Sequence, residues 1–333
     1  MIAPPSTTRP PEASPEPGAA KGPLHGGSRL ADQVFQRLCL ASGLLVLVVL
    51  GLILFSTTKE AMPAFRQEGL GFLTSSKWIP GENHFGALAF IYGTLVVSAI
   101  ALIIAVPVSI GLALFITELA PTGLRTPATY LIDLLAAIPS VVYGLWGILV
   151  FGPQIAKLYT HVSTAFSGIP LLGNLTAGPQ SRSFMTAGII LAIMITPIVT
   201  SISKEVFATV PRDQKEAAFG LGATRFEMIR GAVFPYSRTG LVGAVMLGLG
   251  RAMGETIAVA LVIGSAPAIT AHLFGPGDAM AAVVANQFGE ASGTHRAALI
   301  GLGVVLFVMT VLVNLLARRV TSRADRRLAG GKR

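Results

Sequence analysis

The sequence has little charge and a single cysteine, and each scarcity excludes a class of protein. Only 12% of the 333 residues are charged while 52% are hydrophobic, whereas soluble domains carry about 25% charged residues. This balance, with a mean hydropathy of +0.69, excludes a water-soluble enzyme and indicates a multi-pass membrane protein. Because Cys39 is the single cysteine, an internal disulfide framework and a cysteine-based zinc site are excluded, and we predict no metal site.

Motifs for ATP hydrolysis and for intramembrane catalysis are also missing. The chain has no G-x-x-x-x-G-K-[ST] phosphate loop, which is the sequence that cradles the phosphates of ATP in many ATPases. It has no HExxH, no GxSxG and no paired aspartates within its apolar runs, which argues against an intramembrane enzyme. We therefore predict a protein that is not an enzyme and binds no cofactor of its own.

Six apolar runs are long enough to cross a bilayer, whose hydrocarbon core needs about 20 apolar residues per helix. They lie near residues 38–57, 89–116, 129–151, 184–203, 239–264 and 297–317. The first run is too long for the core of a signal peptide, so we predict an uncleaved helix. The sequence thus predicts an all-α membrane protein with a first transmembrane helix and outer loop at 38–84, a five-helix core at 85–317 and a basic tail at 318–333.

Residues 1–37 precede the first run and are predicted to form a tail. The first thirty are rich in Pro, Ser, Gly and Ala, and such a segment buries too little apolar surface to offset its ordering entropy. We therefore predict disorder, with a polyproline II segment that binds a partner as the alternative.

The distribution of Lys and Arg predicts that both termini are cytoplasmic. With this orientation 18 of the 25 basic residues lie in the inner segments and 6 in the outer loops, and cytoplasmic loops carry the excess of positive charge in membrane proteins. The net charge of +9 is therefore interpreted as a determinant of topology, and we predict no nucleic-acid partner.

Two charges interrupt the fifth run, and they are the strongest indication of a transport pathway. Arg251 lies at the thirteenth position of 239–264, near mid-bilayer, where an arginine costs about 2.5–3.5 kcal/mol. On a continuous helix the i,i+4 spacing places Glu255 on the same face, close enough to pair. A guanidinium offers a planar fork of donors to a phosphate-type oxyanion, and the carboxylate orients that fork or accepts a hydrogen bond from a protonated oxyanion. The alternative is a salt bridge that sets helix register.

Residues 204–238 form the longest predicted inner loop and contain a helix–turn–helix pattern. Pro211 predicts the start of a short helix, and Gly220 or Gly222 predicts its end in a left-handed conformation. Thr224 and Glu227 have the spacing of a capping box at the start of a second helix. We expect that helix to stop near Pro235, because the residue before a proline disfavours helical geometry.

Within this loop, EAAFGLGATRFEMIRGAVFP resembles the EAA loop of ABC-importer permeases. The residues that match the pattern are Glu216, Ala217, Ala218, Gly222 and Pro235, and the sequence departs from it mildly at Ala232 and Phe234, where Ile and Leu are common. The resemblance implies that the loop docks into a groove on an ATPase subunit and transmits its closure to the membrane helices. The alternative is an amphipathic surface hairpin with no partner.

Four further stretches resemble the PstC-type permeases of phosphate importers. They are Asp133–Gly147 (DLLAAIPSVVYGLWG), Met194–Phe207 (MITPIVTSISKEVF), Gly250–Val259 (GRAMGETIAV) and Val283–Ala291 (VVANQFGEA). The similarity covers roughly residues 85–320 and implies a type I ABC importer permease fold, membership in the binding-protein-dependent transport system inner membrane components, and a place in the bacterial plasma membrane. It also implies that Arg251, Glu255 and Thr256 line the substrate pathway.

The resemblance implies partners as well. These are a second, PstA-like permease subunit, a PstB-like ATPase dimer that uses ATP-Mg, and a PstS-like extracytoplasmic phosphate-binding protein. Candidates for contact with the binding protein are Asn286, Glu290 and Arg296, with a solvated loop as the alternative. Asp133 is expected to pair with Arg125 or with another base that faces the lipid.

The predicted function is therefore the membrane permease of an ATP-driven importer of inorganic phosphate. Two alternatives stay open at this point. A sulfate or molybdate permease would share the EAA loop, and an ion-coupled secondary anion transporter would need no ATPase.

Overall fold

The computed structural model describes residues 29–330, with side chains described for 32–319. The chain divides into two units, Met1–Ile53 and Leu54–Arg333. Helix α1 (Arg29–Glu68) begins before the predicted first span. Residues 29–37 are therefore helical, and the disorder predicted for them is wrong. The rest of that tail lies outside the described residues. Of the first unit the structure describes the part of α1 up to Ile53, which has no charged residue from Leu40 onward.

The described residues of the second unit are mainly helical and include one two-stranded hairpin. Its outer-loop elements and first long helix are α2 (Gly71–Thr74), β1 (Trp78–Ile79), the 3-10 turn η1 (Pro80–Glu82), β2 (His84–Phe85) and α3 (Leu88–Leu114), which continues as the π-helical turn η2 (Phe115–Leu119). The middle of the unit contains α4 (Thr122–Ala136), α5 (Ser140–Trp146), the π-turn η3 (Gly147–Phe151), α6 (Gly152–Phe166), α7 (Pro170–Leu175) and α8 (Phe184–Ala208). The last part contains α9 (Arg212–Gly220), α10 (Arg225–Met228), the π-turn η4 (Ile229–Val233), α11 (Phe234–Gly254), α12 (Ile257–Val262), α13 (Met280–Gln287) and α14 (Gly293–Gly330).

Six helices in the described part of the chain are long and apolar enough to cross a membrane. They are Asp32–Glu68, Leu88–Leu119, Ser140–Phe166, Phe184–Ala208, Arg225–Gly254 and Gly293–Arg319. This number confirms the predicted all-α architecture with six spans. The last helix continues to Gly330, so most of the predicted C-terminal tail is helical too.

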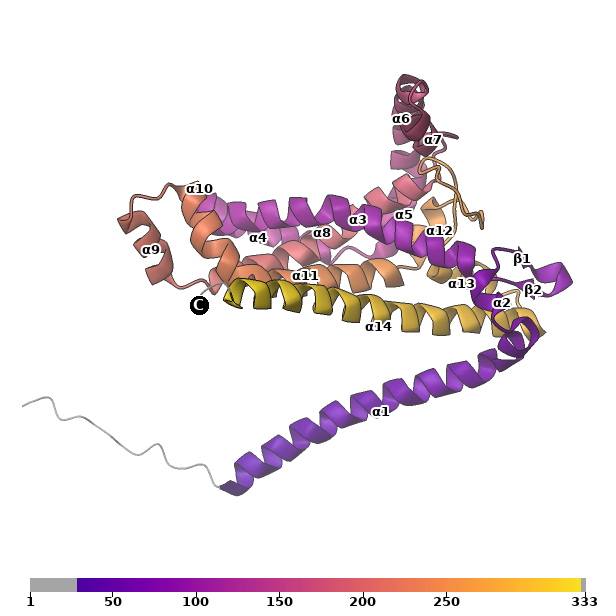
Figure 1. Cartoon of the computed structure of the whole chain (residues 1–333), viewed down its shortest axis with the longest axis horizontal. Coiled ribbons are helices and arrows are strands. Elements are labelled where there is room, and N and C mark those ends of the chain that lie inside the picture. The colour runs from indigo at the N-terminus through magenta and orange to yellow at the C-terminus, as the bar shows by residue number, and fades with distance from the viewer. Residues whose placement is uncertain (1–28, 331–333) are drawn as a thin grey trace, which may run out of the picture. The chain divides into compact units, whose positions relative to one another are not determined.

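Helix α8 lies at the centre of the second unit and packs against α3, α11 and α4. Small residues bring these helices close together: a Cβ on Gly188 of α8 would lie 2.4 Å from Ile100 of α3, and one on Gly248 of α11 would lie 2.6 Å from Val199 of α8. Packing of this kind drives helix association in membranes, where burial of apolar surface supplies little. The helices α3, α8, α11 and α14 run alongside one another in Figure 1, with α9 and α10 at one end and the β-hairpin, α2 and α13 at the other.

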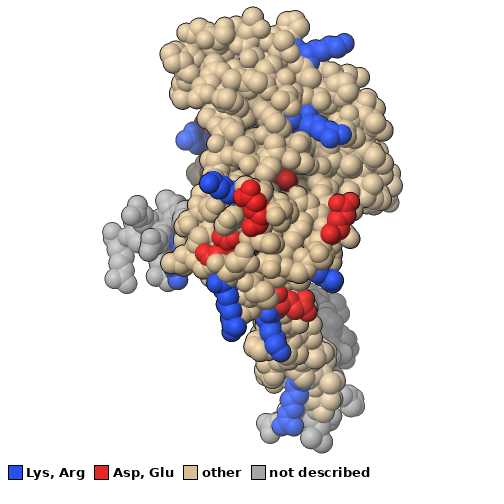
Figure 2. Space-filling model, turned by 90° about the vertical axis from the view of Figure 1, so that its right-hand side faces the viewer, with Lys and Arg blue, Asp and Glu red and all other residues tan. Residues whose placement is uncertain are grey.

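At the end with the β-hairpin, aromatic side chains form a compact cluster. The ring of Trp78 lies 5.0 Å from that of Phe85 and 5.1 Å from that of Phe90, both edge to face, and its Nε1 donates to Oε1 of Gln287 at 3.0 Å. Edge-to-face pairs add about 0.5–1.5 kcal/mol beyond burial. Acidic and basic side chains lie interspersed on the otherwise uncharged surface of this end (Figure 2).

The predicted third span, 129–151, is wrong because it joins two helices. Helix α4 ends at Ala136, and Pro139, with an extended ψ of 140°, precedes α5. A proline lacks the N–H that would continue the helix, and its ring clashes with the carbonyl one turn before it. The long helix therefore begins at Ser140 and runs through α5, η3 and α6 to Phe166.

Candidate functional site

The first candidate site is the hairpin of α9 and α10, called here the coupling hairpin and spanning residues 211–235. Pro211 precedes α9 with extended geometry, and Leu221 and Gly222 end the helix. Gly222 adopts φ +83°, and the N–H of Ala223 donates to the carbonyl of Ala218 at 3.1 Å. This left-handed residue after the helix confirms Gly222, of the two predicted glycines, as the point where the chain turns.

The predicted capping box is present at the start of α10. The backbone N–H of Glu227 donates to Oγ1 of Thr224 at 3.4 Å, and the backbone N–H of Thr224 donates to Oε2 of Glu227 at 2.8 Å. Two N–H groups that lack a partner within the helix are thus satisfied reciprocally, which defines the direction in which α10 leaves the turn.

The prediction that this second helix stops near Pro235 is wrong. The π-turn η4 follows α10 directly, and α11 continues from Phe234 with Pro235 in its first turn. A π-turn shifts the helical hydrogen bonds by one residue, and this shift accommodates the missing N–H of the proline. The hairpin is therefore joined to the membrane-spanning part of α11 by one continuous helical segment, Arg225–Gly254.

An open groove of about 630 Å³ runs between α9 and the segment from α10 to α11. Its lining residues are Gln214, Ala217, Ala218, Leu221, Ala223, Glu227, Gly231, Ala232, Pro235 and Tyr236. Three of the five residues matched to the EAA pattern therefore meet in one groove, while Glu216 and Gly222 are exposed on the same hairpin. The side chains of Ala217 and Ala218 are small, so they leave the space of the groove open.

Large apolar side chains are exposed around this groove. Leu221 is 90% exposed and Phe226 69%, and Phe219 and Tyr236 are also exposed. Exposed apolar side chains that gather beside a concave surface are typical of a protein-binding site.

The second candidate site, at Arg251, Glu255 and Thr256, has a geometry different from the predicted one. Helix α11 ends at Gly254, and Glu255 is extended with φ −69° and ψ 129°. Arg251 therefore lies in the last turn of α11 and not in the middle of a continuous helix, and the i,i+4 relation with Glu255 is broken. No ion pair joins the two side chains within the described residues.

Each of these three residues has a definite local environment. Glu255 is half-buried, and its Oε1 accepts from the N–H of Ala258 at 3.3 Å, in the first turn of α12. The Oγ1 of Thr256 donates to the carbonyl of Gly254 at 3.3 Å. Arg251 is exposed at the surface of the isolated chain. The structure thus assigns Glu255 a capping contact, while it brings all three residues to one break between α11 and α12.

The predicted pair of Asp133 with Arg125 differs from the structure, while contact of the last outer loop with a binding protein stays a prediction. The Nε of Arg125 donates to the carbonyl of Ala120 at 3.0 Å, and no ion pair joins Arg125 and Asp133 in the part of the chain that the structure describes. In the last loop, Nδ2 of Asn286 donates to Oγ of Ser265 at 3.3 Å, and the guanidinium of Arg296 lies 5.0 Å from the centre of the Phe288 ring.

The sequence reasoning missed two groups. Oε1 of Glu118, at the end of η2, lies 2.6 Å from Nζ of Lys215 on α9, and 97 residues separate the two. Asp278 is 3% exposed, its Oδ1 accepts from the N–H of Ala279 at 2.8 Å, and burial raises the pKa of its carboxyl to about 7. Neither pairs with a residue at a helical or strand spacing, so no local pattern could have found them.

Comparison with known proteins agrees with these features. Residues 106–329 match the family described as binding-protein-dependent transport system inner membrane component. The chain is 46% identical over 301 residues to the phosphate transport system permease protein PstC of Mesorhizobium japonicum, covering 90% of this chain and 92% of that protein. It is 44% identical over 303 residues to the protein of the same name from Xylella fastidiosa (strain Temecula1), covering 89% of this chain and 92% of that protein.

A solved structure shares the fold. It is a bacterial alginate ABC transporter in complex with an alginate pentasaccharide-bound periplasmic protein, and it aligns with a TM-score of 0.55 at 17% identity, covering 89% of this chain and 98% of that chain. At this identity the likeness shows the fold alone, and that fold is the one expected of a type I ABC importer permease.

Proposed function

Because this chain belongs to the family of binding-protein-dependent transport system inner membrane components, we propose that it is the permease subunit of an ATP-driven importer of inorganic phosphate. The observation that carries the proposal is its 46% identity with a phosphate transport system permease across 90% of the chain. The six apolar helices place such a subunit in the plasma membrane as a multi-pass protein. Sulfate and molybdate permeases and an ion-coupled secondary transporter are the competing functions.

ATP is hydrolysed by a separate, PstB-like ATPase dimer, and the coupling hairpin is its docking site. The groove lined by Ala217, Ala218 and Pro235 accepts an apolar side chain of the ATPase, and exposed Leu221 and Phe226 are buried when the two subunits meet. The uninterrupted helix from Arg225 to Gly254 supports this role, because a rigid element carries a displacement of the hairpin into the membrane.

The translocation pathway is shared with a second, PstA-like permease subunit. Arg251, Glu255 and Thr256 lie at the break between α11 and α12, and Arg251 is exposed in the isolated chain. An arginine within the hydrocarbon region of a membrane is costly, so we infer that Arg251 faces a water-filled pathway or a partner subunit. Its guanidinium then binds the phosphate oxygens in a bidentate manner.

Phosphate reaches this pathway from a PstS-like binding protein on the extracytoplasmic side. The docking surface is the end of the second unit with the β-hairpin and α13, where charged side chains of both signs lie interspersed (Figure 2). In this topology both termini and the coupling hairpin are cytoplasmic. Labelling of an introduced cysteine at Leu221 or at Glu82 with a membrane-impermeant maleimide, in a Cys39→Ser background, tests this orientation.

Uptake of labelled phosphate into vesicles tests the proposed function. The chain is coexpressed with the second permease and the ATPase, and the purified complex is reconstituted with its binding protein and with ATP on the cytoplasmic side. We expect phosphate uptake that requires ATP hydrolysis and is not displaced by an excess of sulfate or molybdate. Uptake that is displaced by these anions would support a sister permease, and uptake that ionophores abolish without ATP would support a secondary transporter.

A further inference from the structure

A second cavity lies at the base of the coupling hairpin, on the side that faces α3 and α4. It has a volume of about 500 Å³ and is lined by residues of five elements, η2, α4, α9, α10 and η4, and by the chain between η2 and α4. The lining residues are Glu118, Leu119, Ala120, Pro121, Thr122, Arg125, Lys215, Phe219, Arg225, Met228 and Ile229. It is a different space from the groove on the hairpin's other side, since no lining residue is common to both.

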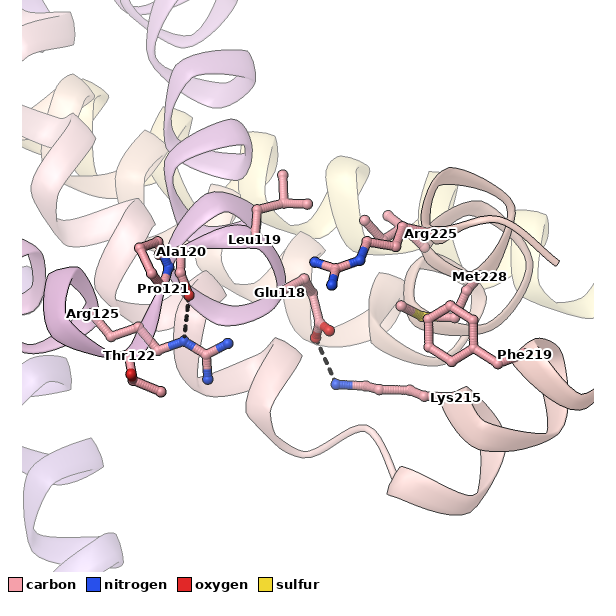
Figure 3. A pocket seen from close by; sticks show the side chains of 11 residues that line it. Glu118, Leu119, Ala120, Pro121, Thr122, Arg125, Lys215, Phe219, Arg225 and Met228 are labelled. Atoms are coloured by element: carbon pink, nitrogen blue, oxygen red, sulfur yellow. Dashed lines mark hydrogen bonds and ion pairs between the residues drawn. The ribbon is translucent and has the colours of Figure 1, made fainter.

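The charges of this cavity are predominantly positive. Three cations, Arg125, Lys215 and Arg225, meet one carboxylate, Glu118, and the ion pair of 2.6 Å with Lys215 neutralises that carboxylate. Figure 3 shows Lys215 bonded to Glu118, with the guanidinium groups of Arg225 and Arg125 directed into the same space. Two positive charges of the cavity therefore have no acidic counterpart in its lining.

Both guanidinium groups retain free donors. The Nε of Arg125 donates to the carbonyl of Ala120, which orients the side chain and leaves its two terminal nitrogens available. The side chain of Arg225 has no hydrogen bond or ion pair to any residue that the structure describes. A guanidinium with two free nitrogens on one edge matches two oxygens of a tetrahedral oxyanion.

The start of α4 is a further feature of the cavity that favours a bound anion. Pro121 precedes this 15-residue helix and gives it no side-chain cap. The N–H of Leu124 donates to the carbonyl of Pro121 at 2.9 Å, whereas the N–H groups of Thr122, which lines the cavity, and of Gly123 have no acceptor within the helix. Such a helix end attracts anions. It acts here together with the two arginines and the formed cavity.

We propose that this cavity binds a phosphate-type oxyanion, either free inorganic phosphate or the phosphate headgroup of an anionic phospholipid. The anion is held between Arg125 on α4 and Arg225 on α10, and thus clamps the coupling hairpin to the corner between η2 and α4. Binding itself does not depend on the proposed function. Its consequence for transport does, because a clamped hairpin moves less when the ATPase closes.

Binding measurements on the full-length chain in nanodiscs test this site and distinguish the two sources. In the first arm, labelled inorganic phosphate is titrated into the chain in pure phosphatidylcholine. In the second arm, no phosphate is added, and native mass spectrometry counts the phosphatidylglycerol molecules retained from a mixed bilayer. Both arms compare the wild type with Arg125→Gln and Arg225→Gln, and Arg230→Gln is the matched control, since Arg230 is an exposed cation of the same hairpin that does not line the cavity.

We expect Arg125→Gln and Arg225→Gln each to weaken binding about tenfold or more in one of the two arms, because each variant removes one charge-assisted hydrogen-bonding group. Arg230→Gln should leave binding unchanged in both arms. Arg225→Lys retains the charge without the fork and should recover only part of the affinity. This variant also provides the test if Arg225→Gln fails to fold.

The proposal is overturned if neither phosphate nor phosphatidylglycerol shows binding that depends on both arginines. It is overturned as well if Arg230→Gln weakens binding as much as Arg225→Gln does, because the effect would then arise from net charge. Phosphate transport by the assembled importer would survive either result, so the two conclusions fail independently.

Discussion

The Nζ of Lys215 lies 2.6 Å from Oε1 of Glu118, and this ion pair joins α9 of the coupling hairpin to η2, the turn that continues α3. The side chain of Glu118 is 9% exposed and that of Lys215 21%. A buried pair of this kind contributes little over an apolar substitute, but loss of one partner leaves the other charge uncompensated. The pair therefore determines where the hairpin sits rather than how stable the whole fold is.

Lys215→Met should destabilise the attachment of the hairpin by about 2 kcal/mol, since the buried carboxylate of Glu118 loses its partner. Hydrogen–deuterium exchange should show faster exchange in α9 and no change in α8. The double variant Glu118→Gln/Lys215→Met should regain part of the loss, as expected for two residues whose effects are coupled. Additive effects of the two single variants would contradict this interpretation of the contact.

Gly222→Ala should weaken docking of the ATPase. Gly222 has φ +83° with no atom within 4 Å of a Cβ built on it, so the expected cost is conformational, about 1–2 kcal/mol for a residue with a side chain. Copurification of the ATPase measures the effect.

Gly220→Ala is the matched control for this prediction. Gly220 is in α9, has open space around it and has no left-handed φ, and alanine is favoured over glycine in a helix by about 1 kcal/mol. Docking should therefore be unchanged or slightly stronger. An equal loss in both variants would show that docking does not depend on the left-handed turn at Gly222.

Arg251→Ala should reduce phosphate uptake by at least about tenfold, and Arg251→Lys should restore only part of it, because an ammonium lacks the bidentate fork. Copurification with the ATPase should be normal in both variants, since Arg251 lies at the other end of the helix that begins at the hairpin. Normal uptake in both would remove this arginine from the pathway.

Asp278→Asn should remove a dependence of stability on pH. Burial raises the pKa of this carboxyl from 3.8 to about 7, so between these values the folded chain binds a proton that the unfolded chain has released. Folding stability is therefore highest below the lower value and falls as pH rises toward 7. Thermal unfolding in detergent, measured from pH ~4 to ~8, should show this fall in the wild type and a flatter profile in the variant.

Glu290→Gln is the control for Asp278, because Glu290 is an exposed carboxylate of the following loop. Its profile should follow the wild type. If Asp278→Asn also follows the wild type, then the carboxyl is ionised in the folded chain and its raised pKa is wrong.

Features that depend on neighbouring residues were predictable. The turn at Gly222 and the capping box of Thr224 and Glu227 are present because their hydrogen bonds join residues a few positions apart. Pro139 lies inside the predicted span 129–151, but it separates α4 from α5. A proline disrupts one hydrogen bond by itself, and whether the helix resumes in the same direction depends on what packs around it.

The sequence by itself determined the class of the protein, the number of its apolar spans and the hairpin that carries the EAA pattern, because hydropathy and local hydrogen bonding act over short stretches of chain. The tertiary structure alone decided that α11 ends before Glu255, that Pro235 is carried within a helix and that Glu118 meets Lys215. It also placed Arg125 and Arg225 around one cavity. Those outcomes depend on the packing of helices that are distant in sequence, and no charge or proline in the sequence specifies its partner.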